Sequence, residues 1–405
     1  MSKKIPCVEC GDAPVNHTLI KASVIISHEM RPFNKGMDKI MGSITNNVTE
    51  KLTPLFVWFM TLIHFGKMRK TYTEEGEHKD GGRTIVLWKE AIRRGIDMEE
   101  LWLGNHPTEL FIAKFNGEMR AFDSLPRPKG RNSESLAWMD DKEVMDQKFE
   151  EAGIPVAKGG DGIARTFSEA LKIFKSVTPP VITKPNVGSR SRHTTIHIND
   201  EAALKRGFDT AKQLSPWVII EEELEGFVFR GTVIGGEVAG IVRREPASVY
   251  GDGTHTVREL VDIENALPVR QGPIFHKIPT DKSAEDELTR QKKTWEYVPQ
   301  KNEIVTLGDK ASRGVGGGIV DVTDEAHPDN IELLRSVGRV LKDMIVGVDF
   351  IMKDITVSWK DQPRSGVIEC NSAPFIDLHY FVLKGKPRNV AGNIWDIIFP
   401  KSHKD

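Results

Sequence analysis

A stretch near the carboxyl end of the chain carries the residues best suited to bind a metal ion. Asp349 lies in one apolar run, and Glu369 and Asn371 lie two positions apart in the next. Side chains at positions i and i+2 of a strand point to the same side, so Glu369 and Asn371 are expected to face together. A hairpin between the runs would bring Asp349 opposite them. Two carboxylates and an amide oxygen are hard ligands that suit Mg2+ or Mn2+.

The same pattern also fits the polar face of an ordinary hairpin, because a glutamate and an asparagine two positions apart are common by chance. The neighbours of Asp349 favour the metal. Val348 and Phe350 are apolar, so the carboxylate is expected in a buried strand. A buried carboxylate without a partner is costly, and a cation is the partner that we expect.

Two lysines upstream could bind phosphate. Lys184 ends an apolar run and precedes a loop whose backbone N–H groups could cradle an anion. Lys142 begins an expected helix, although most lysines are simply solvated surface residues. The loop residues expected at the phosphate are Gly188, Ser189 and Arg190.

Apolar periodicity and turn signals predict the elements that position these residues. Helices are expected over 141–152, over 201–214 and from 331 onward, and strands over 181–185, 217–222, 346–352 and 367–371. Hairpins are expected over 111–122, turning at Asn116-Gly117, and over 229–243, turning at Gly235-Gly236. Residues 83–95 are interpreted as a strand running into a helix, and 52–66 as a buried helix, with a membrane-surface helix as the alternative. Helices that alternate with mixed strand pairs predict an α/β or α+β fold.

Length and composition narrow the class of protein. A chain of 405 residues can hold two or three domains, and the polar, proline-rich segment 125–134 predicts a boundary near 135. The formal net charge of -2 makes nucleic acid a poor partner. No apolar run reaches the roughly 20 residues that a membrane span needs. With three cysteines and no secretory signal at the start, a cytoplasmic protein is expected.

Cys7 and Cys10 form a single C-x-x-C pair. A lone pair of this kind is a weak signal for zinc or redox chemistry, and His17 strengthens it only a little. We therefore leave these residues out of the expected mechanism.

Several motifs in a fixed order resemble one family. DK followed by AGIP, then ITKP, IIEE and VD…ExN occur in the order found in ATP-grasp enzymes, and RREPASVYGDGTHTVRELVDIEN over 243–265 is diagnostic. Over about 139–395 the chain resembles ATP-grasp carboxylate–amine ligases, in particular cyanophycin synthetase and the ATP-grasp part of bifunctional glutathione synthetase. The resemblance implies an α+β ATP-grasp fold, with a lid subdomain over 136–220 and a subdomain carrying the Mg2+ site over 221–400. Residues 1–135 would form a smaller N-terminal α/β domain of unassigned role.

The resemblance also implies roles for particular residues. Lys142 and Lys184 would hold the ATP phosphates under a flap over 188–193, Asp349, Glu369 and Asn371 would hold Mg2+ (or Mn2+), and Arg244, with Arg243 as a second candidate, would lie near the transferred phosphoryl group. The hinge at adenine would comprise Glu221, Glu222 and Glu223. Candidate substrate residues are Asp252, His255, Arg313, His379 and Arg388, with surface cations and ordinary hydrogen-bonded histidines as the alternative.

Two positions depart from the family pattern. Val228 stands where an acidic residue usually binds the ribose hydroxyls, so Glu223 or Glu225 would have to substitute. The flap contains Arg190, Arg192 and His193 in place of a glycine-rich run, which would add positive charge near the phosphates unless the loop is simply a solvated basic one.

The expected function is ATP-dependent formation of an amide bond between a carboxylate and an amine, through an acylphosphate. The substrates would be amino acids or peptides, and the enzyme could be a homo-oligomer. Two alternatives stay open: a nucleotide-binding protein that has lost turnover, and a small-molecule kinase that stops at phosphorylation.

Overall fold

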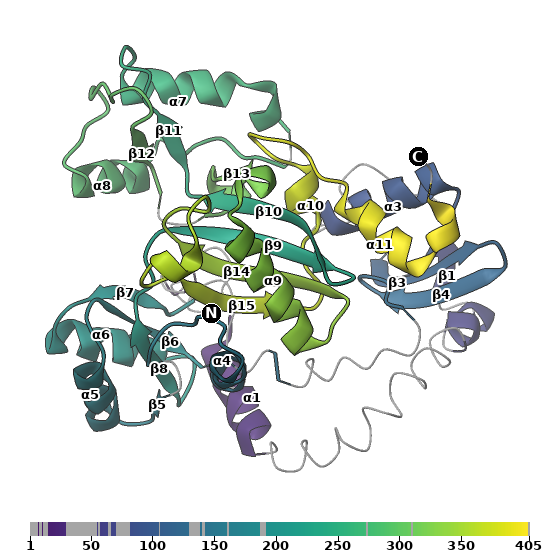
Figure 1. The fold of residues 1–405 in the computed structure, drawn as a ribbon, viewed down its shortest axis with the longest axis horizontal. Coiled ribbons are helices and arrows are strands. Elements are labelled where there is room, and N and C mark those ends of the chain that lie inside the picture. Colours follow the sequence, from purple (N-terminus) through teal and green to yellow (C-terminus); the bar gives the residue numbers. More distant parts are fainter. Residues whose placement is uncertain are drawn as a thin grey trace, which may run out of the picture.

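The computed structural model describes residues 7, 10, 15–29, 55, 57–63, 66–69, 82–104, 106–128, 138–139, 142–159, 162–186, 192–272, 274–308 and 311–403. Over these residues the chain forms three larger antiparallel sheets and an outer lobe (Figure 1). Helices and antiparallel sheets are mixed along the chain, so the α+β class expected from the sequence is confirmed.

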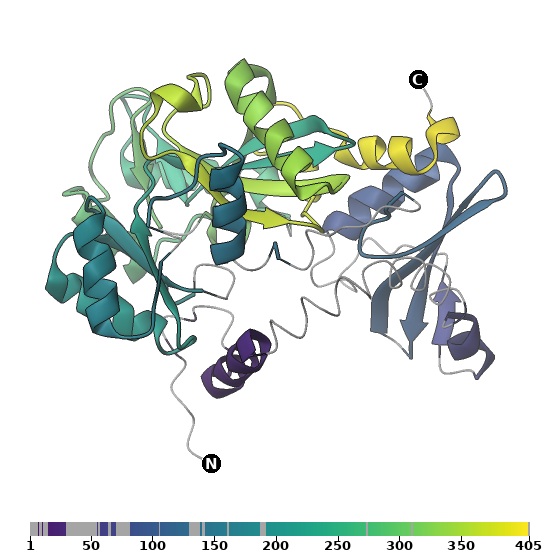
Figure 2. The same ribbon diagram turned by 60° about the horizontal axis from the view of Figure 1, so that its bottom comes forward.

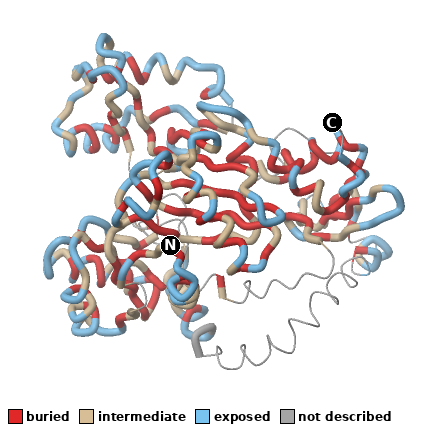
Figure 3. The backbone as a smooth tube through the Cα atoms, viewed as in Figure 1, coloured by how far each residue is buried: buried red, intermediate tan, exposed pale blue. Residues whose placement is uncertain are grey.

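A five-stranded central sheet has the order β13-β10-β9-β14-β15. Its strands are β9 (Phe227–Ile234), β10 (Glu237–Glu245), β13 (Gly318–Asp321), β14 (Ile345–Met352) and β15 (Gly366–Asn371). Alternate residues of β9 and β14, such as Phe229, Val233, Val348 and Phe350, are apolar and buried. They pack with α9 (Pro328–Leu341) in one core, which leaves the other face of the sheet free to carry polar groups. Figure 3 shows the buried backbone concentrated in these strands.

A smaller sheet, with the order β5-β8-β6-β7, lies beside the central sheet (Figures 1 and 2). It contains β5 (Ile163–Ala164), β6 (Val181–Pro185), β7 (Thr195–Ile198) and β8 (Val218–Glu222). Helices α5 (Phe167–Ser176) and α6 (Glu201–Ala211) pack on it around their own apolar core. Helix α4 (Lys142–Glu151) precedes it and packs with the core of the central sheet through Met145 and Phe149.

The outer lobe is formed by β11 (Ser248–Tyr250), α7 (Val257–Ala266), α8 (Lys282–Arg290) and β12 (Ile304–Thr306). It has a separate small core that includes Val249, Val261 and Leu288 (Figure 1). Thr256 and Glu259 begin α7 with a capping box, which fixes the start of that helix.

The N-terminal sheet is a meander of β1 (Gly66–Arg69), β2 (Asp97–Leu103), β3 (His106–Phe115) and β4 (Glu118–Asp123). The hairpin expected at Asn116-Gly117 is confirmed, because both residues have positive φ and Phe115 pairs with Glu118. Helix α3 (Gly82–Arg94) and the last long helix, α11 (Val390–Ile398), pack against this sheet in one shared core. The carboxyl end of the predicted unit 221–400 therefore packs with the N-terminal unit.

Two expectations about the first hundred residues are wrong. The segment 83–95 is helical from its start, although the β-branched run Thr84-Ile85-Val86 favours a strand. The reason is that the buried residues Val86, Leu87 and Ala91 lie on one face of a helix. The described part of 52–66 is a helix over 57–62, but only Val57 is buried there, whereas Trp58 and Leu62 are exposed. Within the described residues, no helix combines the length and the apolar character required to cross a membrane.

Trp395 joins the terminal units. It is fully buried, and its indole N–H donates to the Leu87 carbonyl over 3.0 Å. We expect Trp395→Ala to lower the free energy of unfolding by about 3–5 kcal/mol, because the cavity cannot close fully. Trp58→Ala is the matched control, since Trp58 is 59% exposed. Urea denaturation checks both variants, and equal effects would contradict the packing described.

Candidate functional site

The polar face of the central sheet carries a row of charges. Asp349 on β14 pairs in register with Arg230 on β9 and with Glu369 on β15. Residues opposite each other on neighbouring strands share a face, so these three side chains stand side by side. The predicted meeting of Asp349 with Glu369 is therefore seen in the strand register, and Arg230 completes the row.

Arg230 is the partner that the sequence did not reveal for Asp349. Its Nε and Nη2 donate to the two carboxylate oxygens of Asp349 over 2.5 and 2.7 Å. Both side chains are buried, at 5% and 7% exposed. The cation that pairs with buried Asp349 in the protein is thus a bidentate guanidinium, so the burial of this carboxylate does not by itself argue for a metal ion.

Asn371 and Gly347 shape the space beside this pair. With its amide oriented to satisfy both neighbours, Asn371 donates to Glu369 Oε1 over 3.2 Å and accepts from Arg230 Nη2 over 3.3 Å. A Cβ on Gly347 would lie 2.7 Å from Pro374 Cβ and 3.1 Å from Arg230 Nη1. A glycine at 347 thus leaves room for the guanidinium.

A second group of charges surrounds Lys184. Its ammonium donates to Glu221 over 2.5 Å, and Glu221 is almost fully buried. Burial lowers the pKa of Lys142, as does the positive charge of Lys184, while Glu369 and Glu221 act in the opposite direction. Lys142 thus lies within electrostatic reach of both Lys184 and Glu369, and the two predicted groups form one cluster.

Asp146 is a member of this cluster that sequence reasoning missed. It lies one helical turn after Lys142 on α4 and is buried. Burial raises its pKa to about 7, against the effect of Lys184, while Glu221 raises it further. The spacing i, i+4 from Lys142 was the available signal.

Arg244 and Arg243 lie on opposite faces of β10. Arg244 pairs in register with Val228, so it shares the face of Arg230, and burial lowers its pKa against the influence of Asp349. Arg243 pairs with Phe229, and its guanidinium binds Glu245 over 2.5 Å. The structure therefore brings Arg244 to the cluster and directs Arg243 away from it.

Several buried donors in this region have no acceptor among the residues that the structure describes. They are Nη1 of Arg230, Nε of Arg244 and Nη1 of Arg313. Arg313 also donates to Asp377 over 2.6 Å, and its positive charge lowers the pKa of Arg244. A buried N–H without an acceptor is costly, so these donors fit an anionic ligand such as a phosphoryl group.

The oxygen donors beside them fit a hard divalent cation. Glu369 is half-buried, and its carboxylate faces Asn371. Both oxygens of Asp349 are engaged by Arg230, so Glu369 and Asn371 are the more available pair. Carboxylate and amide oxygens are the ligands that Mg2+ accepts while it keeps water and phosphate oxygens.

The other hinge glutamates are engaged by the protein. Glu222 accepts from the backbone N–H of Thr178, and Glu223 pairs with His197 over 2.8 Å. Arg364 donates to the carbonyls of Thr178, Pro179, Pro180 and Glu223, which locks β6 to the end of β8. Glu225, the other candidate for ribose, pairs with Lys353 over 2.5 Å.

Four of the five expected substrate residues make local structural contacts. Asp252 pairs with His255 over 2.6 Å and accepts from the backbone of its own turn, in the outer lobe. His379 is fully buried against Thr232, and burial lowers its pKa to about 3, so it is a neutral core histidine. Arg388 is bound by Asp321 and Asp324. Of the expected substrate residues, buried side-chain nitrogens without a hydrogen-bond partner among the described residues occur in Arg313 (Nη1) and in His379 (Nδ1), and only the arginine is positively charged.

The predicted flap over 188–193 is described only in part. Gly188, Ser189 and Arg190 lie outside the described residues. His193 is fully buried and contacts Cys7, Cys10 and the Thr210 carbonyl. The expectation that His193 adds positive charge near phosphates is therefore wrong, because its ring faces sulfur atoms.

The N-terminal unit fastens the loop after Asn371. Arg83 of α3 donates to the Ala373 carbonyl over 2.9 Å, and Arg127 donates to the Ser372 carbonyl over 2.5 Å. Arg127 also binds Asp343 over 2.7 Å, just before β14. This unit therefore positions the strand ends that carry Asp349 and Asn371.

Several known proteins resemble this chain in sequence or in fold. The chain is 34% identical over 266 residues to cyanophycin synthetase of Synechocystis sp., which covers 64% of this chain and 30% of that protein. It is 29% identical over 352 residues to the glutathione biosynthesis bifunctional protein GshAB of Listeria welshimeri, covering 82% and 43%. The crystal structure of a bifunctional glutathione synthetase from Pasteurella multocida matches with a TM-score of 0.62 and 24% identity, covering 79% of this chain and 43% of that one. This chain has the ATP-grasp fold.

The resemblance to cyanophycin synthetase and bifunctional glutathione synthetase is confirmed, and the ATP-grasp chain described here is homologous to both. No family model matches it. The ATP-grasp chain spans 30% of the length of that cyanophycin synthetase and 43% of that bifunctional protein.

The Arg230–Asp349 pair generates a stability prediction. Arg230→Met should lower the free energy of unfolding by about 3–5 kcal/mol, because the carboxylate of Asp349 stays buried without its counter-charge. The double variant Arg230→Met, Asp349→Asn should recover a large part of that loss. Chemical denaturation of the nucleotide-free protein measures both, and additive losses would contradict the pairing.

Asp146 generates a pH prediction. Its pKa is about 7 in the folded protein and near 3.8 in a free side chain, so between these values the folded state binds the extra proton. Stability therefore falls as pH rises through this window, by at most about 1.4 kcal/mol per pH unit from this group. Asp146→Asn should exceed wild type in stability by a margin that grows from pH 4 to 7 and then stays constant. A pH-independent difference, or the same trend in the exposed-site control Asp262→Asn, would contradict this.

Proposed function

We propose that this protein is an ATP-dependent ligase that joins a carboxylate to an amine through an acylphosphate, with ADP and phosphate as products. The observation that carries the proposal is the buried cluster in which Lys142 interacts electrostatically with Lys184 and Glu369, while Arg230 and Arg244 present donors without an acceptor among the described residues. The names of its homologues, cyanophycin synthetase and glutathione synthetase, denote amide-forming enzymes and support the same reaction class.

In this proposal the two lysines bind the ATP phosphates. Glu369 and Asn371 would hold Mg2+ together with Asp349, and the ion would supply charge neutralisation for phosphoryl transfer. Because Glu221 already binds Lys184, the lysine is held in a fixed position before ATP arrives. Residues 136–220 and 221–400 then act as the two subdomains around the nucleotide, and Glu221 to Glu223 lie at the adenine hinge.

The first chemical step forms a bond from a substrate carboxylate oxygen to the γ-phosphorus, and the bond from that phosphorus to the bridging oxygen of ADP breaks. The orphan donors of Arg244 and Arg313 stabilise the charge on the acylphosphate oxygens. The amine then attacks the acyl carbon, loses a proton and expels phosphate. Phosphate leaves readily, which makes the activated acid a far better acyl donor than the free carboxylate.

Amino acids or peptides are the proposed substrates, because the named products of the homologues are peptide-like amides. Asp252, His255, His379 and Arg388 are engaged in local contacts, so we now propose Arg313 as the substrate-side cation. We also propose that the enzyme forms a homo-oligomer.

A nucleotide-binding protein with reduced turnover is the second candidate. The position expected to bind ribose is Val228, which faces Arg244, and Glu225 is held by Lys353. Weaker ribose binding would follow. This candidate and a small-molecule kinase differ from the ligase in whether an amide forms.

The test measures phosphate release from ATP with a panel of amino acids and dipeptides, together with mass spectrometry of the products. We expect phosphate release that depends on both an acid and an amine, with one amide formed per phosphate. Tight ATP binding without turnover would instead support the sensor, and a stable phosphorylated product without an amide would support the kinase.

Two variants connect the reaction to the cluster. Glu369→Gln and Lys184→Met should each lower kcat by roughly 100-fold or more while the fold is kept, since each removes a charge that contacts the triphosphate or its cation. Glu332→Gln, an exposed glutamate of α9, is the matched control and should retain activity. Full activity in Glu369→Gln would contradict the proposed site.

A further inference from the structure

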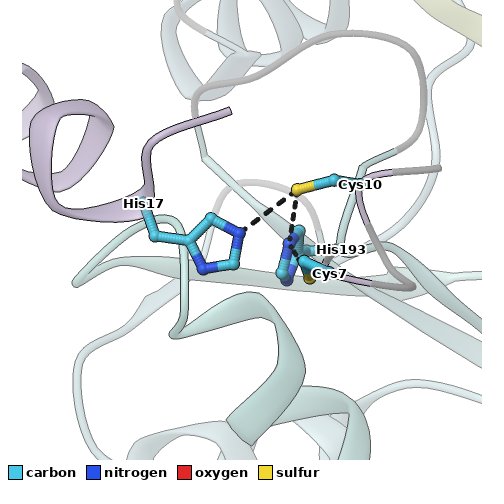
Figure 4. A group of neighbouring side chains, drawn as sticks. All are labelled: Cys7, Cys10, His17 and His193. Atoms are coloured by element: carbon cyan, nitrogen blue, oxygen red, sulfur yellow. Dashed lines mark hydrogen bonds between the residues drawn. The ribbon is translucent and has the colours of Figure 1, made fainter. Parts of the chain in front are cut away.

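Four residues from two distant parts of the chain meet at one point. Cys7, Cys10 and His17 come from the segment at and before the start of α1 (His17–Glu29), and His193 lies just before β7 (Figure 4). One ligand atom from each residue lies within 4.8 Å of every other. Cys10 and His193 are buried, and the other two are half-buried.

Three sulfur–nitrogen distances in this group are close to those around one tetrahedral ion. Cys10 Sγ lies 3.2 Å from His17 Nε2 and 3.5 Å from His193 Nε2, and Cys7 Sγ lies 3.6 Å from His193 Nε2. Zinc bonds of about 2.3 Å to sulfur and about 2.0 Å to nitrogen, at tetrahedral angles, place sulfur and nitrogen about 3.5 Å apart. The observed separations fall around this value.

The surroundings orient the ligands. His193 Nδ1 lies 3.0 Å from the Thr210 carbonyl, so this nitrogen carries the proton and donates it, which leaves Nε2 with a lone pair toward the sulfurs. The backbone N–H of Cys10 donates to the Cys7 carbonyl in a turn that brings both sulfurs to one side. His193 also has a positive φ of 55°, which is uncommon for a residue with a side chain.

We propose that Cys7, Cys10, His17 and His193 form a closed structural Zn2+ site. Two thiolates and two imidazoles are a soft and borderline donor set that selects zinc over Mg2+, so this site is distinct in chemistry from the carboxylate cluster of the central sheet. With four protein ligands and no open position, the ion is structural rather than catalytic.

The site joins two segments separated by 176 positions, from His17 to His193. It attaches the start of α1 to the sheet that carries Lys184, because His193 precedes β7 and β7 pairs with β6. The loop expected to close over the phosphates ends at His193, so bound zinc would fix the carboxyl end of that loop. This consequence rests on the proposed function, whereas the zinc site itself does not.

The experiment uses the full chain without a histidine tag, purified under reducing conditions. Elemental analysis should find about one zinc per chain after dialysis, and Co2+ in its place should give tetrahedral d–d bands with a thiolate charge-transfer band. Zinc removal by a chelator should make the Cys7 and Cys10 thiols reactive to alkylation, and added Zn2+ should protect them. This last measurement uses unaltered protein, so it does not depend on the folding of a variant.

Cys10→Ser and His193→Gln should each lower zinc content at least about tenfold. The matched controls are Cys370→Ser, a buried cysteine of β15, and His197→Gln, an exposed histidine of β7, and both should keep one zinc. The proposal is overturned if anaerobically reconstituted wild type binds no more zinc than the Cys7→Ser, Cys10→Ser variant, or if the controls lose as much zinc as Cys10→Ser. Loss of zinc without loss of phosphate release would leave the metal site standing and separate it from the proposed function.

Discussion

Arg230 and Asp349 face each other across two neighbouring strands, and almost no water reaches either side chain. Neither charge can be buried alone, so the pair requires β9 and β14 to keep the register that places Arg230 opposite Asp349. The pairing of β14 with β15 then places Glu369 next to Asp349. The pairing of β9 with β10 places Arg244 on the same face, two residues along β10 from Val242, the partner of Arg230. The guanidinium satisfies Asp349 and still presents Nη1, which turns a structural pair into one side of an anion site. Gly347 keeps the space for it open.

Positive and negative side chains are mixed in this cluster, and their balance explains its chemistry. Lys142 and Lys184 repel each other, and Glu221 and Glu369 offset this repulsion in the absence of ligand. A triphosphate would take over that role and would meet buried donors that have no other acceptor. Preorganised charges of this kind favour phosphoryl transfer because they need little rearrangement when the reaction begins. Arg83 and Arg127 donate hydrogen bonds to the backbone carbonyls that follow Asn371. These bonds connect the N-terminal unit to the site.

Local sequence patterns predicted the strands and turns, which depend on neighbouring residues. They did not predict contacts between segments that lie far apart in the chain. The two-residue spacing of Glu369 and Asn371 and the turns at Asn116-Gly117 and Gly235-Gly236 follow from strand geometry, so the hairpins could be predicted. Arg230 lies 119 positions from Asp349, and only the strand pairing reveals that they bind each other. Sequence also could not separate Arg243 from Arg244, because the face that each occupies depends on the register of β10. The sequence predicted that His193 is a cation of the phosphate flap, because the cysteines that it contacts lie more than 180 positions away in the chain.

The central claim is that one face of the central sheet receives the ATP phosphates together with a divalent cation. A crystal structure of the protein with a non-hydrolysable ATP analogue and Mn2+ tests this most directly, because anomalous scattering locates the ion independently of the nucleotide. The account predicts an Mn2+ ion about 2.1 Å from an oxygen of Glu369, with the terminal phosphate in hydrogen-bond contact with Lys184 and Arg244. An ion remote from Glu369, or a triphosphate bound away from both lysines, would contradict it.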